Sequence, residues 1–159
     1  MGRISGRIDG RGAFVELKVM ASPQRVAALK RAGRAFAQPM THLALIDTGA
    51  SNSVIDVRIA ADLGLVPTGR VPIHTPSSGT TLDEMDAFDI TLVMESPGSR
   101  PESFTVGAVG GNLAPGGFYA ILGRDVLDSC VLTYDGPVGS YTIEFGQDAL
   151  NRPNVIGSV

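Results

Sequence analysis

Residues 43–51 read Leu-Ala-Leu-Ile-Asp-Thr-Gly-Ala-Ser, an apolar run that ends in an acid and several small residues. Four consecutive apolar residues bounded by turn-forming residues are typical of a buried strand that enters a tight loop. Residues 53–56 predict the strand that leaves it. Asp47 is therefore expected on a loop between strands, where backbone amides and the Thr48 hydroxyl can hold its carboxylate. These residues alone equally support a plain turn in which Asp47 only caps the loop.

A second stretch, residues 120–127 (Ala-Ile-Leu-Gly-Arg-Asp-Val-Leu), favours the catalytic interpretation. It resembles the second signature of the retroviral-type (retropepsin-like) aspartic proteases of clan AA: two apolar residues, Gly, Arg, and an Asp or Asn that opens a short helix. The resemblance covers about residues 13–20 and 43–145, with the motifs in the family's order. It implies an all-β fold with short helices, a closed acid-protease barrel with one lobe per chain, and a two-fold homodimer.

The resemblance also implies a role for each motif residue. Asp47 resembles the catalytic aspartate, and Thr48 the residue whose hydroxyl bonds across the dimer beneath the two aspartates. Gly49 matches the position whose carbonyl approaches the substrate backbone. The residues implied to bind substrate are Ala50, Ser51 and, in a flap tip that spans residues 77–81, Ser77, Ser78, Gly79 and Thr80. The residues implied to support the site are Ile121, Leu122, Gly123, Arg124 and Asp125.

Two positions depart from the family pattern. In viral members an acid follows the Ala of the first motif and pairs with the Arg of the second. Here Ser51, followed by Asn52, takes that place, so Arg124 is expected to lack its usual partner. After Phe145, residues 154–157 are only a weak candidate for the terminal strand that joins viral dimers.

Peptide hydrolysis by this mechanism needs two carboxylates around one water, one as general base and the other protonated to polarise the carbonyl. Like charges about 3 Å apart cannot both ionise, so the pair shares a proton. One Asp-Thr-Gly motif per chain therefore calls for a homodimer. The predicted function is an aspartic endopeptidase that acts on extended peptides or proteins through Asp47 and its copy, without metal or cofactor. The alternative is a retropepsin-like peptide-binding or dimerisation module with weak or no catalysis.

The remaining sequence predicts one mainly β domain over residues 1–159. With 43% hydrophobic and 18% charged residues the chain is globular, and 20 Gly and 10 Pro indicate many turns between short strands. The first twelve residues are polar and Gly-rich, and no strand is predicted there. The single cysteine, Cys130, excludes an intrachain disulfide and is expected to be a buried thiol. His42, His74 and Cys130 show no zinc-site spacing.

Charge is distributed unevenly along the chain. Eight basic and two acidic residues precede Asp47, whereas five basic and fourteen acidic residues occur from Asp47 onward. Ser22-Pro23 is a helix-start signal, and a basic helical insertion is predicted at about residues 22–36. Its cations are expected to be the solvated face of that helix. Nucleic acid is not an expected partner, because no aromatic residues interleave with the cations; an adaptor role for this basic segment is a weaker alternative.

No apolar stretch approaches the roughly 20 residues that a membrane span needs. The N-terminal residues also lack the apolar run of a signal peptide. We therefore expect no membrane partner and a cytoplasmic location.

Overall fold

The computed structural model describes residues 2–73 and 83–146. Its strands are β1 (Gly2–Asp9), β2 (Gly12–Ala21), β3 (Met40–Ile46), β4 (Val54–Asp56), β5 (Gly69–Ile73), β6 (Asp83–Met94), β7 (Glu102–Gly111), β8 (Ala120–Leu122), β9 (Cys130–Asp135) and β10 (Ser140–Phe145). Its helices are α1 (Pro23–Arg31), α2 (Val57–Asp62) and α3 (Arg124–Leu127), with a short 3-10 turn, η1 (Ala114–Gly116). No helix within these described ranges is long and apolar enough to cross a membrane.

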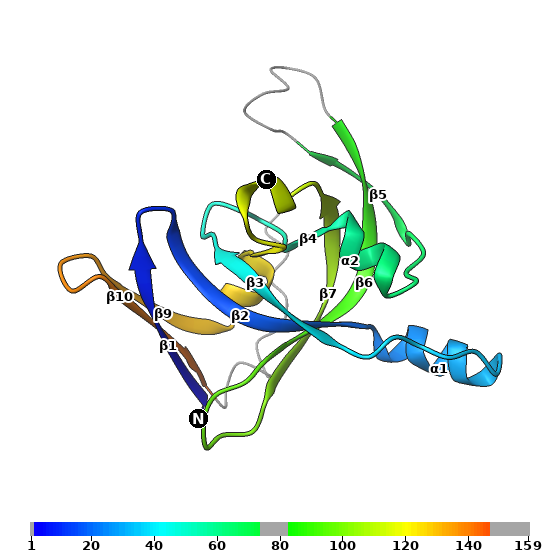
Figure 1. Cartoon of the computed structure of the whole chain (residues 1–159), viewed down its shortest axis with the longest axis horizontal. Helices are drawn as coiled ribbons and strands as arrows, with labels where there is room; N and C mark the ends of the chain where they lie inside the picture. The colour runs from blue at the N-terminus through cyan, green and yellow to red at the C-terminus, as the bar shows by residue number, and fades with distance from the viewer. Residues whose placement is uncertain (1, 74–82, 147–159) are drawn as a thin grey trace.

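Six strands close into a barrel in the order β6-β7-β4-β8-β3-β2, because β2 pairs back with β6. Inside this ring β3 runs parallel to β8, β4 runs antiparallel to β8, and β4 runs parallel to β7. β1, β10 and β9 extend the sheet outward from β2 (Figure 1). The predicted mainly β fold with a closed barrel and short helices is confirmed.

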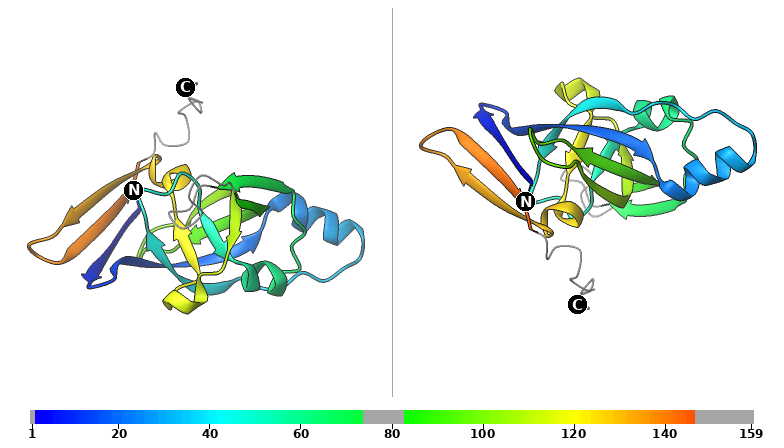
Figure 2. Two further views of the ribbon diagram at one scale, coloured as in Figure 1. Left: turned by 90° about the horizontal axis from the view of Figure 1, so that it is seen from above. Right: turned by 90° about the horizontal axis from the view of Figure 1, so that it is seen from below.

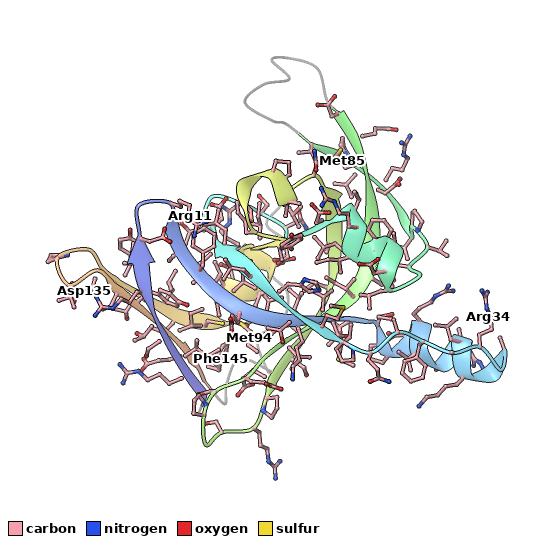
Figure 3. The ribbon with its side chains drawn as sticks, viewed as in Figure 1. Arg11, Arg34, Met85, Met94, Asp135 and Phe145 are labelled. Atoms are coloured by element: carbon pink, nitrogen blue, oxygen red, sulfur yellow. The ribbon has the colours of Figure 1, made fainter. Side chains whose placement is uncertain are left out.

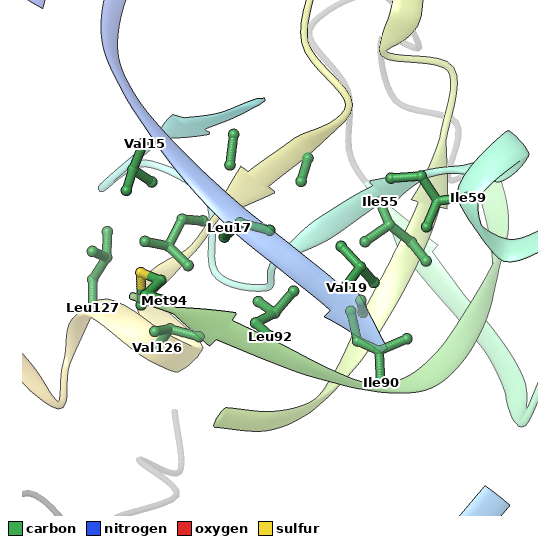
Figure 4. Packing of buried hydrophobic residues seen from close by; sticks show 14 of the residues in the cluster. Val15, Leu17, Val19, Ile55, Ile59, Ile90, Leu92, Met94, Val126 and Leu127 are labelled. Atoms are coloured by element: carbon green, nitrogen blue, oxygen red, sulfur yellow. The ribbon is translucent and has the colours of Figure 1, made fainter. Parts of the chain in front are cut away.

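The barrel interior is filled by alternate residues of its strands. On β2, Val15, Leu17 and Val19 are buried while Glu16 is exposed, as the two-residue period of a strand requires. Figure 4 shows these side chains packed with those of β6, the β4–α2 segment and α3. Burying each large aliphatic side chain contributes about 1.5–3 kcal/mol, so this cluster is the main stabilising feature of the barrel.

β1 is a strand that the sequence analysis missed. Glycine alternates with isoleucine on its inward positions, while arginine and serine point outward. A Cβ on Gly6 would lie 2.5 Å from the ring of Tyr141, so only glycine lets this buried ring rest on β1. Tyr141 also donates its hydroxyl proton to the carbonyl of Phe14 on β2. A strand whose inner face is half glycine gives little hydrophobic alternation, which explains the omission.

α1 is the helix of the predicted insertion. The Ser22 hydroxyl accepts a hydrogen bond from the Arg25 N–H at 3.3 Å, and Pro23 occupies the first turn. The helix ends at Arg31, two residues before Gly33 adopts the left-handed conformation (φ +65°) that favours glycine. Figures 1 and 2 show α1 projecting from the barrel at the end opposite the β9–β10 hairpin.

Candidate active site

Asp47 lies directly after β3, on a tight turn held by short hydrogen bonds. Its N–H donates to the Leu122 carbonyl at 3.1 Å, and its Oδ1 accepts the Gly49 N–H at 2.8 Å. The Ala50 N–H closes the turn on the Asp47 carbonyl at 3.3 Å. Asp47 and Ala50 are half-buried, whereas Thr48 and Gly49 are exposed. The carboxylate is thus held in place near the surface of the barrel, partly exposed.

The two sequence motifs meet because β3 and β8 are adjacent parallel strands. Leu122 is fully buried and Ile121 half-buried, so β8 forms the floor beneath the Asp47 turn. The Arg124 N–H donates to the Ala50 carbonyl at 2.9 Å. The structure therefore brings together Asp47 and the supporting residues that the sequence predicted.

Arg124 finds partners other than the acid that was expected. Its Nη1 donates to the Thr48 carbonyl at 3.1 Å, and its Nη2 donates to the Ser51 hydroxyl at 2.9 Å. The guanidinium thus holds both sides of the Asp47 turn from the start of α3. Ser51 replaces the charged partner by a neutral acceptor, which gives a weaker hydrogen bond than a carboxylate would. Arg124 was expected to lack its usual acidic partner, and on this turn it bonds instead to a backbone carbonyl and a hydroxyl.

Ser53 is a supporting residue that the sequence analysis did not identify. It is fully buried. Its N–H and hydroxyl donate to the two carboxylate oxygens of Asp125, at 2.9 Å and 2.7 Å. Its hydroxyl also accepts the Gly123 N–H at 3.1 Å. This network ties the strand leaving the Asp47 loop to the second motif and gives Asp125 a defined structural role.

Gly123 sits where two backbone segments touch. A Cβ at this position would lie 2.6 Å from the carbonyl carbon of Asn52, 2.7 Å from its oxygen and 2.9 Å from the Ser53 nitrogen. These neighbours are backbone atoms and cannot swing away. We therefore expect Gly123→Ala to lower the free energy of unfolding by about 2–3 kcal/mol, an overpacking cost. Urea unfolding measures it, with Gly69→Ala as the control, since a Cβ there meets nothing within 4 Å. Equal midpoints for the two variants would contradict this expectation.

Asp56 is a second acid that the sequence analysis did not identify. Its side chain is fully buried at the end of β4, where it caps α2. One oxygen accepts the Arg58 N–H at 3.0 Å, and the other accepts those of Leu113 and Ala114, both at 2.8 Å. Burial raises the pKa of this carboxyl, but the three backbone donors and the nearby Arg58 guanidinium outweigh it, so the pKa lies below its usual value. Asp56 therefore stays ionised and anchors the loop before β8.

The predicted flap tip, with Ser77, Ser78, Gly79 and Thr80, lies outside the described residues. β5 and β6 are described on either side of it, paired from Gly69↔Ala87 to Ile73↔Asp83. The carboxylates of β6 are exposed, and Arg70 lies 3.2 Å from Glu84 and 3.4 Å from Asp86. This acidic stretch of β6 is thus a solvated hairpin arm. The role of the tip stays a prediction.

Cys130 is half-buried after α3, and its thiol donates to the Val126 carbonyl at 3.5 Å. Burial, with a smaller contribution from the Glu102 carboxylate, raises its pKa to about 12. At pH 8 we expect iodoacetamide to alkylate it about a thousandfold more slowly than a thiol of ordinary pKa 9.0, because the thiolate is the reactive form. Mass spectrometry of the native and guanidinium-unfolded chain measures both rates. Equal rates in the two states would contradict the raised pKa of this half-buried thiol.

Among the described residues, no group of three or more His, Cys, Asp or Glu side chains could hold a metal ion. A cavity of about 600 Å³ lies between β1, β2 and the β6–β7 connection, lined by residues such as Phe14, Ser96 and Tyr141. It does not include the Asp47 turn. At the turn itself the structure shows a half-buried Asp47 whose carboxylate accepts the Gly49 N–H.

No protein-family model and no curated protein matches the chain. Among solved structures it is similar to a retropepsin-like aspartic protease from Rickettsia conorii, with a TM-score of 0.54 over 89% of this chain and 90% of that chain. The chain has a retropepsin-like fold. Because only 14% of the aligned residues are identical, the likeness extends to the fold alone. The roles of individual residues therefore rest on their own geometry.

Proposed function

We propose that the chain is an aspartic endopeptidase whose active form is a two-fold homodimer. The observation that carries this proposal is the Asp47 turn: one carboxylate, held by Gly49 and braced by Arg124 from the second motif, on a retropepsin-like barrel. A single carboxylate cannot act as both general base and general acid on one water. A second copy would supply the other, and the pair would keep one proton between them.

The outer sheet offers a surface for that association. β9 follows α3 directly and forms the last strand of the sheet, with its outer edge unpaired in the described chain. Val131 and Tyr134 on this strand are 61% and 60% exposed. An unpaired edge with large apolar side chains favours pairing with another strand. Association through β9 would act close to the active site, since only α3 and two residues separate β9 from Gly123.

Hydrolysis would proceed without a covalent intermediate. Water held between Asp47 and its copy would lose a proton to the ionised carboxylate while attacking the peptide carbonyl, and the protonated carboxyl would hydrogen-bond the carbonyl oxygen. The substrate would lie extended across the dimer, with main-chain hydrogen bonds providing affinity. Thr48, Gly49, Ala50 and Ser51 would contact it, and the flap tip would close over it.

A peptide-library digest at several pH values, with and without pepstatin, tests this function alongside a measurement of mass in solution. We expect pepstatin-sensitive cleavage that rises as the pH falls toward the range in which the dyad holds one proton, and a mass of two chains. A chain that binds pepstatin or extended peptides but never cleaves them would instead support the peptide-binding module, for which the neutral Ser51 partner of Arg124 is the motivating observation.

A further inference from the structure

α1 and its connection to β3, residues 22–39, form a projecting segment that we call the basic arm. No Asp or Glu occurs between Glu16 and Asp47. Lys30, Arg31 and Arg34 are exposed near the end of the arm, where Figure 3 labels Arg34. None of these three cations forms an ion pair with an acid in the described part of the chain.

The three cations are solvent-exposed, as expected of a solvated helix face, but their charge pattern differs from that of most such faces. Such faces usually interleave acids and bases, which support each other three or four residues apart, whereas the arm gathers like charges. The arm also adds little to the core, since Leu29 is the buried residue of α1. Its base is nevertheless firmly attached: the Ser22 N–H donates to the Asp89 carbonyl at 3.3 Å, and Arg25 Nη2 donates to the Gly64 carbonyl at 3.3 Å. The fold thus presents a positive surface on a defined support.

β3 sets the distance between this surface and the Asp47 turn. The strand runs from the arm to Asp47 (Figure 1), and its length at about 3.3 Å per residue gives roughly 23 Å. The helix carries the cations about 10 Å farther out. An extended polypeptide held at Asp47 therefore needs about ten residues to reach the arm.

We propose that the basic arm is an exosite for an acidic segment of the protein substrate, located about ten residues or more from the bond that is cleaved. This inference rests on the proposed endopeptidase function and adds a substrate class to it. Lys30, Arg31 and Arg34 would attract the acidic segment and raise the local concentration of substrate at the Asp47 turn, an effect that weakens with salt.

The chemistry of the arm favours an acidic polypeptide over the other anionic partners. Three cations on a short arm make few phosphate contacts, so the electrostatic affinity for nucleic acid would be low at physiological salt. The aromatic ring of the arm, Phe36, has the Lys30 ammonium 5.6 Å from its centroid, so a base that stacked on that face would displace the cation. None of the large exposed apolar side chains of the described chain lies on α1, so the helix has nothing to insert into a bilayer.

Binding is tested with the inactive Asp47→Asn chain, so that it does not depend on turnover. The probe is a fluorescein-labelled peptide of about six glutamates, and fluorescence anisotropy follows it at low and physiological salt. We expect the Lys30→Gln/Arg31→Gln/Arg34→Gln variant to bind it about 5- to 20-fold more weakly than the chain with an intact arm. The control, Arg3→Gln/Arg7→Gln/Arg100→Gln, removes the same charge from other exposed positions and should keep the affinity. Equal losses in both variants would overturn the proposal.

Kinetics then test the link to catalysis. A peptide that the active chain cleaves is joined to the acidic segment through a Gly-Ser spacer, in one substrate of about four residues and in another of about twelve residues. We expect the long spacer alone to lower KM, by about 5-fold or more, with kcat unchanged, and the arm variant to abolish the difference. Identical KM values for the two spacers would refute an exosite at this distance. Tighter arm-dependent binding to duplex DNA or to phosphatidylserine vesicles than to the acidic peptide would overturn the substrate class. Arm-dependent binding of the acidic peptide without any cleavage would refute both the endopeptidase function and the exosite role.

Discussion

Asp47→Asn is expected to lower kcat/KM for peptide hydrolysis by a factor of about 10³ or more while the chain stays folded. The amide cannot accept the proton of the attacking water, and the proposed dimer would lose its pair of carboxylates. The fold should tolerate the change, because the amide oxygen can still accept the Gly49 N–H that Oδ1 accepts at 2.8 Å. We expect the free energy of unfolding to change by less than about 1 kcal/mol. Initial rates on a cleaved peptide and urea unfolding measure the two effects.

Asp128→Asn is the matched control. It removes one carboxylate from an exposed position four residues beyond Arg124, away from the Asp47 turn, and should keep the wild-type rate.

Mixing dissociated wild-type and Asp47→Asn chains in equal amounts adds a test of the shared site, since about one quarter of random dimers would hold two intact carboxylates. Activity that follows the number of wild-type chains, rather than the fraction of dimers with two intact carboxylates, would show that each Asp47 works alone. A purified Asp47→Asn chain that cleaves at the wild-type rate would end the endopeptidase hypothesis.

The sequence predicted the parts of the site that short-range patterns determine. The apolar run before Asp47 and the Ile121-Leu122-Gly123 run each predict a buried strand followed by a turn. The structure has these two strands side by side. The roles of Ser53 and Asp56 could not be found in this way. Ser53 bonds to a residue 72 positions away, and Asp56 to amides 57 and 58 positions away.

Two other differences have a similar origin. Ser51 was identified as a missing acid, yet its hydroxyl accepts from Arg124 across 73 positions of sequence. β1 was not predicted because its inner face relies on glycine beneath a distant tyrosine ring. In both cases the residue type is chosen by a neighbour in space, and one sequence carries no local sign of that neighbour.

Asp56→Ala is expected to lower the free energy of unfolding by about 3–5 kcal/mol, the largest stability effect that we predict. The substitution leaves the N–H groups of Arg58, Leu113 and Ala114 without their buried acceptor. Urea unfolding at neutral pH measures the loss. Asp62→Ala is the control, because Asp62 is exposed near the end of the same helix and should change stability by less than about 0.5 kcal/mol. Equal unfolding midpoints for the two variants would contradict the anchoring role of Asp56.

The pH dependence of this effect follows from the lowered pKa of Asp56. A carboxyl with a lower pKa in the folded chain stabilises the fold fully above its ordinary unfolded pKa of about 3.9, and that contribution disappears as the pH falls through the folded value. The stability difference between wild type and Asp56→Ala should therefore be constant from neutral pH to about pH 5 and shrink below about pH 4. A difference that instead grows toward acid would contradict the sign.

This acid limit bears on how the activity profile is to be measured. The proposed dyad would favour turnover as the pH falls, whereas protonation of Asp56 would weaken the anchor of the loop before β8. A loss of activity below about pH 4 that coincides with a loss of native tyrosine fluorescence would come from unfolding, because the carboxyl of Asp56 titrates in that range. A loss that precedes the spectroscopic change would come from the Asp47 pair, since the doubly protonated dyad lacks a base. Recording both signals on one sample separates the catalytic carboxylate from the structural one.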